Sequence, residues 1–281
     1  MLVNLNEVLL PAKRGKYGVG LFNAITLEQA KGIIAAAEEM KCPAIVGTAE
    51  VLLPFAALEE TASILIPMAK KASVPIVVHY DHGLTFEKCI TALQLGFSSI
   101  MYDCSTDTYE ENVRKVAEIV EIAHVYGATV EAELGHVGDN EGSIEGNLYI
   151  DDPSAFYTDP IEAKDFVMRT KVDALAIAVG TAHGAYKLPP KVDFERIETI
   201  ANMVSVPLVL HGGSGLSNHD FKEAILRGIS KVNIFTDLDR AAADGVKKAF
   251  AQGCVTMTST MSYQIEAVKE EVMKKMTLFL S

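Results

Sequence analysis

Three histidines stand where apolar, strand-like segments of the sequence give way to loops: His82, His183 and His211. The apolar runs that precede them begin near residues 75, 174 and 207. A lone histidine at such a position is most often a structural residue. Three of them at equivalent positions instead indicate a shared ion, because three imidazoles that leave one coordination position open are typical of catalytic zinc.

Carboxylates occupy related positions. Asp81 directly precedes the first histidine of this trio, Asp103 ends the next apolar run, and Glu131 and Glu133 alternate along a further one. A carboxylate buried in an apolar strand is costly unless cations or donors surround it, so each glutamate could serve the site or a structural ion pair. Strand alternation puts His79 on the face of Asp81 and opposite the first histidine, which predicts a supporting partner rather than a metal ligand.

Short apolar runs alternate with amphipathic segments along the chain, in eight strand-then-helix units. Apolar strands covered by helices are typical of a parallel sheet. Eight such units within 281 residues predict a (β/α)8 TIM barrel, with a doubly wound open sheet as the alternative. The predicted strands are Tyr17–Asn23, Ala44–Thr48, Pro75–Tyr80, Ser98–Tyr102, Thr129–Leu134, Ala174–Val179, Leu208–His211 and Lys231–Phe235. Helices are predicted over Thr26–Met40, Leu58–Ala72, Thr85–Leu95, Tyr109–Tyr126 and Ile161–Thr170.

No linker or break in composition divides the chain, which predicts one catalytic domain over residues 1–281. The carboxyl ends of all barrel strands face one mouth, so the three histidines are expected to meet there. The long polar segment Gly135–Pro160 is expected to be a lid or a binding loop. An extra amphipathic helix, Ser259–Leu280, lies outside the repeat and is expected to serve packing or assembly, with a homodimer or homotetramer as the expected state.

The composition limits the classes of partner that are expected for this chain. The net charge is −12, from 25 basic and 37 acidic residues without a Lys/Arg cluster, which argues against nucleic acid as a partner. The sequence contains no apolar run long enough to span a bilayer, so no membrane partner is expected. The four cysteines are scattered without a CxxC pair, which is typical of reduced thiols in a cytoplasmic protein.

Small-residue turns follow the last two predicted strands, in His211–Gly215 and in Asn233–Asp237. Glycine lets backbone N–H groups approach an anion closely, and the start of a following helix adds its dipole. Barrel enzymes commonly bind phosphate at these two loops. A metal and a phosphate at one mouth indicate chemistry on a phosphorylated carbonyl compound.

The chain resembles the class II, metal-dependent ketose-bisphosphate aldolases, which cleave fructose or tagatose bisphosphates. The resemblance runs nearly the whole length and rests on five motifs in order: Asp81–Gly83, Val130–Gly135, His183–Lys187, His211–Gly215 and the Asn233…Asp237 turn. It implies one catalytic Zn²⁺ on the three histidines, with Asp103 and Glu133 resembling ligands of an alternative or second metal position, or of a monovalent cation. The residues implied to hold the phosphate of dihydroxyacetone phosphate are Gly184, Lys187, Gly212, Gly213, Ser214, Asn233 and Thr236.

Retro-aldol cleavage leaves electron density on a ketone carbon, which a divalent metal stabilises as a Lewis acid. A carboxylate must take the proton of the C4 hydroxyl, and Asp81 is placed beside the predicted metal to do so. A second group must exchange a proton with the enediolate carbon. Glu141 is expected in this role, because it keeps the family's spacing from Glu133 and lies in the long loop, with Glu145 as a weaker candidate.

The chain departs from the family pattern where members hold the distal end of the substrate. It has Ala49 where a serine often precedes Glu50, Phe235 where an aspartate is typical, and Asp239 where an arginine is typical. An aspartate in place of an arginine replaces an attractive charge with a repulsive one, and a charge-assisted contact is worth about 1.5–3 kcal/mol. The sequence therefore predicts a ketose 1-phosphate or related sugar acid whose distal end carries no phosphate.

Three other functions remain open. Another loop could supply a distal phosphate site, as in a true fructose- or tagatose-1,6-bisphosphate aldolase that releases glyceraldehyde 3-phosphate. A metal-dependent barrel hydrolase or isomerase could use the same three histidines, although it would not need the phosphate turns. A sugar-phosphate sensor without activity could retain the fold, although it would not need Asp81.

Overall fold

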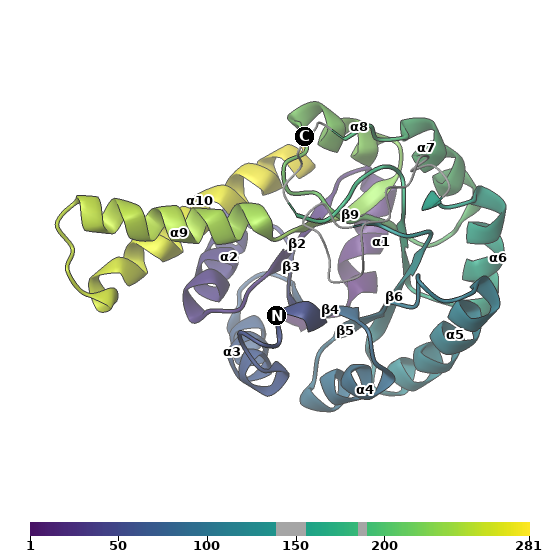
Figure 1. The fold of residues 1–281 in the computed structure, drawn as a ribbon, viewed down its shortest axis with the longest axis horizontal. Coiled ribbons are helices and arrows are strands. Elements are labelled where there is room, and N and C mark those ends of the chain that lie inside the picture. Colours follow the sequence, from purple (N-terminus) through teal and green to yellow (C-terminus); the bar gives the residue numbers. More distant parts are fainter. Residues whose placement is uncertain (139–155, 185–189) are drawn as a thin grey trace.

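A ring of parallel strands wrapped by helices forms the body of the protein in this computed structural model, which describes residues 1–138, 156–184 and 190–281 (Figure 1). Strands β2 to β9 pair in parallel in the order β4-β3-β2-β9-β8-β7-β6-β5, and pairing of β4 with β5 closes the ring. The (β/α)8 barrel prediction is confirmed, and the open doubly wound sheet is excluded. The barrel strands are β2 Val19–Asn23, β3 Ala44–Ala49, β4 Ile76–Gly83, β5 Ser99–Tyr102, β6 Thr129–Leu134, β7 Ala174–Ile177, β8 Leu208–Leu210 and β9 Ile229–Ile234.

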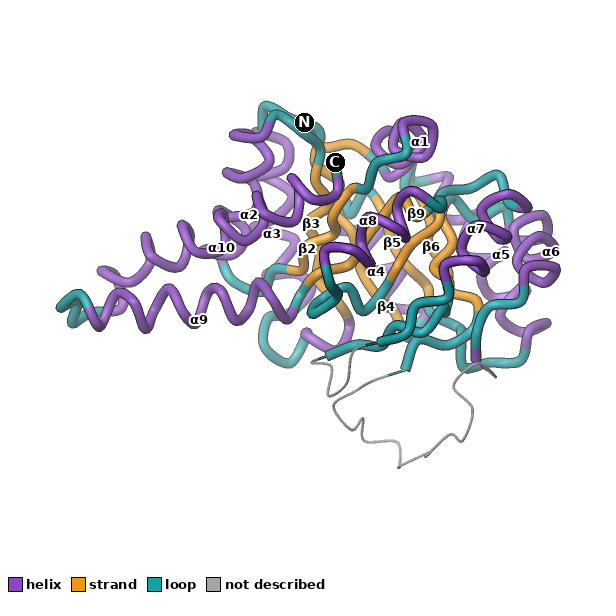
Figure 2. Tube along the Cα trace, turned by 90° about the horizontal axis from the view of Figure 1, so that it is seen from above, coloured by secondary structure: helices purple, strands orange, loops and turns teal. Residues whose placement is uncertain are grey.

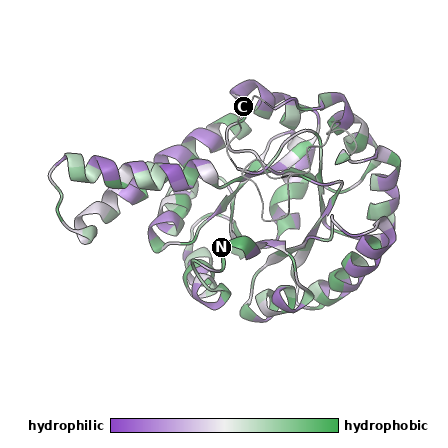
Figure 3. Ribbon diagram, viewed as in Figure 1, coloured by the Kyte–Doolittle hydropathy of each residue, from purple (hydrophilic) through white to green (hydrophobic). Residues whose placement is uncertain are grey.

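The helices pack around the outside of the ring, and each carries hydrophilic and hydrophobic residues together (Figure 3). This mixture is expected of helices that have one side on a barrel and the other in water. The helices are α2 Leu27–Met40, α3 Leu58–Lys71, α4 Phe86–Leu95, α5 Tyr109–Val125, α6 Pro160–Thr170, α7 Phe194–Met203, α8 Asn218–Leu226, α9 Thr236–Ala251 and α10 Met257–Phe279. Within the described ranges, none is both long and apolar enough to cross a membrane.

The first residues form a plug that the sequence patterns did not predict. A short strand, β1 Leu2–Val3, pairs with β4, and helix α1 Leu5–Gly15 follows it. The buried side of α1, with Leu5 and Leu9 at its centre, packs against barrel residues such as Val77. These barrel residues are apolar, and α1 removes them from water at the end of the barrel opposite the mouth.

Helices α9 and α10 form an arm that projects from the barrel (Figures 1 and 2). The two helices and α2 pack closely enough to require glycine. A Cβ on Gly245 would lie 2.6 Å from the carbonyl oxygen of Tyr263, and one on Gly32 would lie 2.8 Å from that of Ile265. The predicted C-terminal helix is present and begins two residues earlier than expected, after Thr256, whose hydroxyl accepts a hydrogen bond from Ser259 N–H.

Candidate metal and active site

The end of β4 carries Asp81 and His82 and departs from regular strand geometry. Its register with β5 shifts between Tyr80 and Gly83, and His82 has a left-handed backbone with φ of 44°. A regular strand would put neighbouring side chains on opposite faces. The expectation that His79 lies opposite His82 is therefore wrong, because the irregular turn brings the His82 side chain into the group formed by the other histidines.

The structure brings the three predicted metal histidines together at the mouth. The imidazole centroid of His82 lies 4.8 Å from that of His183 and 4.5 Å from that of His211, and the last two are 5.8 Å apart. Each contributes a ring nitrogen to a group whose atoms lie within 4.8 Å of one another. The buried Nε2 of His82 has no hydrogen-bond partner among the described residues. Three converging imidazoles fit a tetrahedral metal with an open position.

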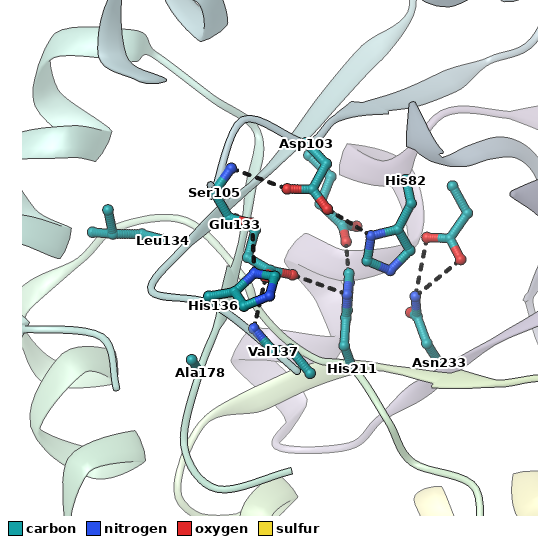
Figure 4. Close-up of polar contacts among 12 residues, drawn as sticks. His82, Asp103, Ser105, Glu133, Leu134, His136, Val137, Ala178, His211 and Asn233 are labelled. Carbon is teal, nitrogen blue, oxygen red and sulfur yellow. Dashed lines mark hydrogen bonds and ion pairs between the residues drawn. The ribbon is translucent and has the colours of Figure 1, made fainter. Parts of the chain in front are cut away.

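Carboxylates orient these imidazoles. Asp103 Oδ2 lies 2.8 Å from His82 Nδ1, and Glu133 Oε2 lies 3.2 Å from His211 Nδ1 (Figure 4). Burial lowers the pKa of His82, but the charges of Asp81, Asp103 and Glu133 outweigh this effect and raise it to about 10. The same negative charge favours a metal cation. His82, Asp103 and Glu133 also form a second candidate ligand group, as the sequence implied.

A buried ion network lies inside the barrel next to this group. Glu131 Oε1 is 2.8 Å from His211 Nε2, and Glu131 Oε2 is 2.8 Å from Lys231 Nζ. All three side chains are fully buried. Burial raises the pKa of Glu131, but Lys231 and His211 outweigh it and lower the value to about 2. Lys231 was not predicted as part of the site. Its mark in the sequence is that a lysine stands at the start of an apolar strand.

Asp81 is held by two amides. Asn23 Nδ2 donates to Oδ2 at 2.8 Å, and Asn233 Nδ2 donates to Oδ1 at 3.1 Å. His79 Nε2 lies 3.7 Å from Oδ1, which agrees with a supporting position for that histidine. Burial raises the pKa of Asp81, but the cations around it hold the value well below its usual range. Asn23 was missed, because nothing in its own strand marks it as a partner of a carboxylate 58 residues further along the chain.

The two predicted phosphate turns are joined to each other. Gly213 N–H donates to the Asn233 carbonyl at 3.1 Å, and Ser214 Oγ accepts from Phe235 N–H at 3.3 Å. Gly212 has φ of 65°, and a Cβ there would lie 2.3 Å from the Ala182 carbonyl oxygen. The described members of the predicted phosphate set thus follow three neighbouring strands. Gly184 comes after β7, and Gly212, Gly213 and Ser214 come after β8. Asn233 lies near the end of β9, and Thr236 begins α9.

Some predicted site residues have another contact than expected, or lie outside the described part of the chain. Asn233 was expected at the phosphate, yet its side-chain amide contacts Asp81. Lys187, Glu141 and the weaker candidate Glu145 lie outside the described residues. The described ends of their two loops are hydrogen-bonded, since His183 N–H donates to the Gly138 carbonyl at 2.8 Å.

The predicted distal residues follow two strands: Ala49 ends β3, and Phe235 and Asp239 come after β9. Ala49 is buried and is in register with Asp81. Asp239, on the first turn of α9, accepts a hydrogen bond from Gln29 Nε2 at 3.2 Å. Phe235 is half-buried just before α9.

Comparison with known proteins decides the family of this barrel. The family model for class II fructose-bisphosphate aldolase matches residues 3–281. The chain belongs to the class II fructose-bisphosphate aldolase family. It is therefore placed among aldehyde-lyases, in a family that is metal-dependent and acts on phosphorylated sugars.

Relatives within this family are similar to this chain over most of their own length. The fructose-bisphosphate aldolase of Geobacillus stearothermophilus is 41% identical over 89% of this chain and 86% of its own. The Escherichia coli protein YdjI is 41% identical over 99% of this chain and 98% of its own. The crystal structure of the YdjI aldolase covers 99% of this chain and 97% of its own at a TM-score of 0.88 and 37% identity. A putative fructose-1,6-bisphosphate aldolase of Coccidioides immitis follows at a TM-score of 0.86 and 28% identity.

Proposed function

We propose that this class II aldolase depends on zinc and reversibly cleaves a ketose 1-phosphate to dihydroxyacetone phosphate and an aldehyde without a distal phosphate. The observation that carries the aldolase chemistry is the position of Asp81, a buried carboxylate held by two amides directly beside three converging imidazoles. A hydrolase or isomerase with the same histidines would not need the phosphate turns, in which Gly213 N–H donates to the Asn233 carbonyl at 3.1 Å.

His82, His183 and His211 would hold the Zn²⁺, which when bound supplies Lewis-acid stabilisation of the substrate carbonyl. Asp103 and Glu131 fix the ring orientation of two of these imidazoles through bonds of 2.8 Å each. Glu133 and Asp103 would also serve an alternative metal position together with His82.

Asp81 would accept the proton of the C4 hydroxyl when the carbon–carbon bond breaks. Its two amide donors leave it oriented, and its lowered pKa keeps it ionised. Glu141 would exchange the proton at the enediolate carbon, a role that rests on its spacing from Glu133.

The phosphate of dihydroxyacetone phosphate would bind at the turns after β7, β8 and β9. Gly212 and Gly213 let the chain approach an anion closely there, and the start of α9 at Thr236 contributes its dipole. Gly184, Lys187, Ser214 and Asn233 complete the proposed set.

The distal end of the substrate would lie between Ala49, Phe235 and Asp239. Ala49 offers no hydroxyl, and Asp239 adds a negative charge where a distal phosphate would be repelled. The competing proposal is cleavage of fructose or tagatose 1,6-bisphosphate to glyceraldehyde 3-phosphate. It is favoured by the relative named fructose-bisphosphate aldolase, which is 41% identical.

The deciding experiment condenses dihydroxyacetone phosphate with a panel of aldehydes, with and without a chelator. Neutral aldehydes should react with higher kcat/KM than glyceraldehyde 3-phosphate, and the chelator should stop every reaction. Comparable efficiency on fructose 1-phosphate and fructose 1,6-bisphosphate would overturn the distal assignment but leave the aldolase chemistry in place.

We also propose that residues 1–281 act as one catalytic domain, that the protein is cytoplasmic, and that it assembles as a homodimer or homotetramer. The described cysteines are free thiols. The projecting α9–α10 arm offers a surface for assembly, with exposed apolar residues such as Phe250 and Val255 near its tip. Light scattering coupled to size-exclusion chromatography would give the mass, and a monomer would overturn the assembly.

A further inference from the structure

Glu50 receives a set of hydrogen bonds that the proposed chemistry does not use. It lies in a 3-10 helix, η1 Glu50–Leu52, that follows β3. Its Oε2 accepts from Tyr80 Oη at 2.8 Å, from Leu84 N–H at 2.7 Å and from Thr85 N–H at 3.3 Å. Its Oε1 accepts from Thr85 Oγ1 at 3.3 Å. One carboxylate thus binds two backbone amides immediately after the turn that carries His82.

This turn has a conformation that the chain would not adopt on its own. His82 has φ of 44°, a left-handed conformation that is unfavourable for a residue with a Cβ. Gly83 is pressed against β5, since a Cβ on it would lie 2.7 Å from the Met101 carbonyl oxygen. A strained turn persists only where contacts with the surrounding residues hold its backbone in place.

Two carboxylates hold this turn from opposite sides. From β5, Asp103 contacts the His82 imidazole at 2.8 Å, and its N–H donates to the Gly83 carbonyl at 2.9 Å. From the end of β3, Glu50 holds Leu84 and Thr85. Asp103 therefore fixes the ring, and Glu50 fixes the backbone that presents it.

We propose that Glu50 is a positioning residue for the metal site, which sets the backbone of the His82 turn and thereby the affinity and geometry of the three-histidine centre. Glu50 does not contact the metal ligands itself. Its effect passes through the amides of Leu84 and Thr85 and through the hydroxyl of the fully buried Tyr80. The inference rests on the proposed metal function of His82.

The test measures Co²⁺ binding to the full-length, metal-depleted protein, by titration and by the visible absorption of the bound ion. Glu50→Ala should weaken Co²⁺ binding about 10–100-fold, the usual effect of losing a partner that orients a ligand, and should change the absorption spectrum. Glu50→Gln should stay within about threefold of wild type, because its amide oxygen can still accept from Tyr80 and Leu84.

Glu60→Ala is the matched control. Glu60 lies beyond the same loop, and its carboxylate accepts from Ala57 N–H at 2.9 Å at the start of α3. Glu60→Ala should leave Co²⁺ affinity and absorption unchanged. If Glu50→Ala keeps wild-type affinity and spectrum, or if Glu60→Ala reproduces its loss, the inference is overturned. If the wild-type protein fails to bind Co²⁺, the proposed metal site itself fails, which is a separate outcome.

Discussion

Asp103 and His82 are joined by a hydrogen bond in which the carboxylate Oδ2 lies 2.8 Å from the imidazole Nδ1. A proton held on Nδ1 leaves the lone pair on Nε2, the atom that has no hydrogen-bond partner in the described part of the chain. The pair therefore selects the nitrogen that would bind metal. It also supplies negative charge next to the ion.

Removal of this partner should weaken metal binding. We expect Asp103→Ala to lower Zn²⁺ affinity about 10–100-fold, because the imidazole loses both its fixed tautomer and its orientation. Competition with a chromophoric chelator would measure the change. Asp107→Ala is the control, since Asp107 pairs with Lys115 on the surface at 2.8 Å, and the variant should leave the affinity unchanged. Equal losses in both variants would contradict the assignment of Asp103.

Removal of the metal should abolish turnover and lower the stability of the fold. Dialysis against a strong chelator should stop cleavage, and Zn²⁺ should restore it. An ion present at about 1,000 times its dissociation constant adds about 4 kcal/mol to the free energy of unfolding, so the melting temperature should fall on depletion. Calorimetry with and without added Zn²⁺ would show the shift. Full activity after depletion, verified by elemental analysis, would refute metal dependence.

Asp81→Asn should separate chemistry from metal binding. The amide keeps the shape of the side chain but cannot accept the C4 hydroxyl proton, so kcat should fall about 10²–10⁴-fold. Zinc content should stay at the wild-type level, because Asp81 is not among the three imidazole ligands. Turnover assays combined with elemental analysis would test both expectations. Wild-type turnover would assign the base elsewhere.

Lys231→Met should destabilise the protein. Lys231 Nζ lies 2.8 Å from Glu131 Oε2 and 2.7 Å from Asn233 Oδ1, and its loss leaves the buried Glu131 carboxylate without this cation. We expect a loss of about 3–5 kcal/mol in the free energy of unfolding, as measured by urea denaturation. Adding Glu131→Gln should recover part of it.

The control for that measurement is Lys247→Met, which removes an exposed ion pair with Asp244 of 2.8 Å. Such surface pairs contribute about 0–1 kcal/mol, so its urea midpoint should match that of the wild type. A Lys231→Met protein as stable as this control would show that the network tolerates an unpaired carboxylate.

Asp239→Arg should shift the substrate preference. An added charge-assisted contact of about 1.5–3 kcal/mol would raise kcat/KM for a bisphosphate about 10–100-fold relative to its 1-phosphate analogue. Asp239→Asn is the matched control, because it removes the charge and keeps an acceptor for Gln29 Nε2. It should raise the ratio less than arginine does. An unchanged ratio in both variants would place distal recognition elsewhere.

Most of the barrel could be predicted because buried parallel strands and amphipathic helices have different periods of apolar residues. The convergence of His82, His183 and His211 followed from the barrel itself, since parallel strands end at one mouth. Helix α1 was not predicted, because the strand-helix repeat contains no counterpart of it. The side of β4 on which His82 lies was predicted wrongly. The turn there is left-handed, and Glu50 just after β3 and Asp103 just after β5 form hydrogen bonds around it that leave no local pattern in the sequence.

The partners of Asp81 illustrate the same limit. Asn23 and Asn233 lie far from it in the sequence, and their amides meet it only because β2 lies next to β9 and close to β4 in the ring. The family resemblance implied a phosphate role for Asn233. Nothing in that turn indicated that its side-chain amide also reaches Asp81.

Helix α1 covers the end of the barrel opposite the mouth, and buried side chains such as Val77 and Ile45 fill the interior between the two ends. Substrate, products and the proposed metal would therefore all reach the three imidazoles from the mouth of the barrel. A chelator must reach the ion by the path that the substrate takes. Bound sugar phosphate should therefore slow the removal of the metal by a chelator, because it occupies the path to the ion.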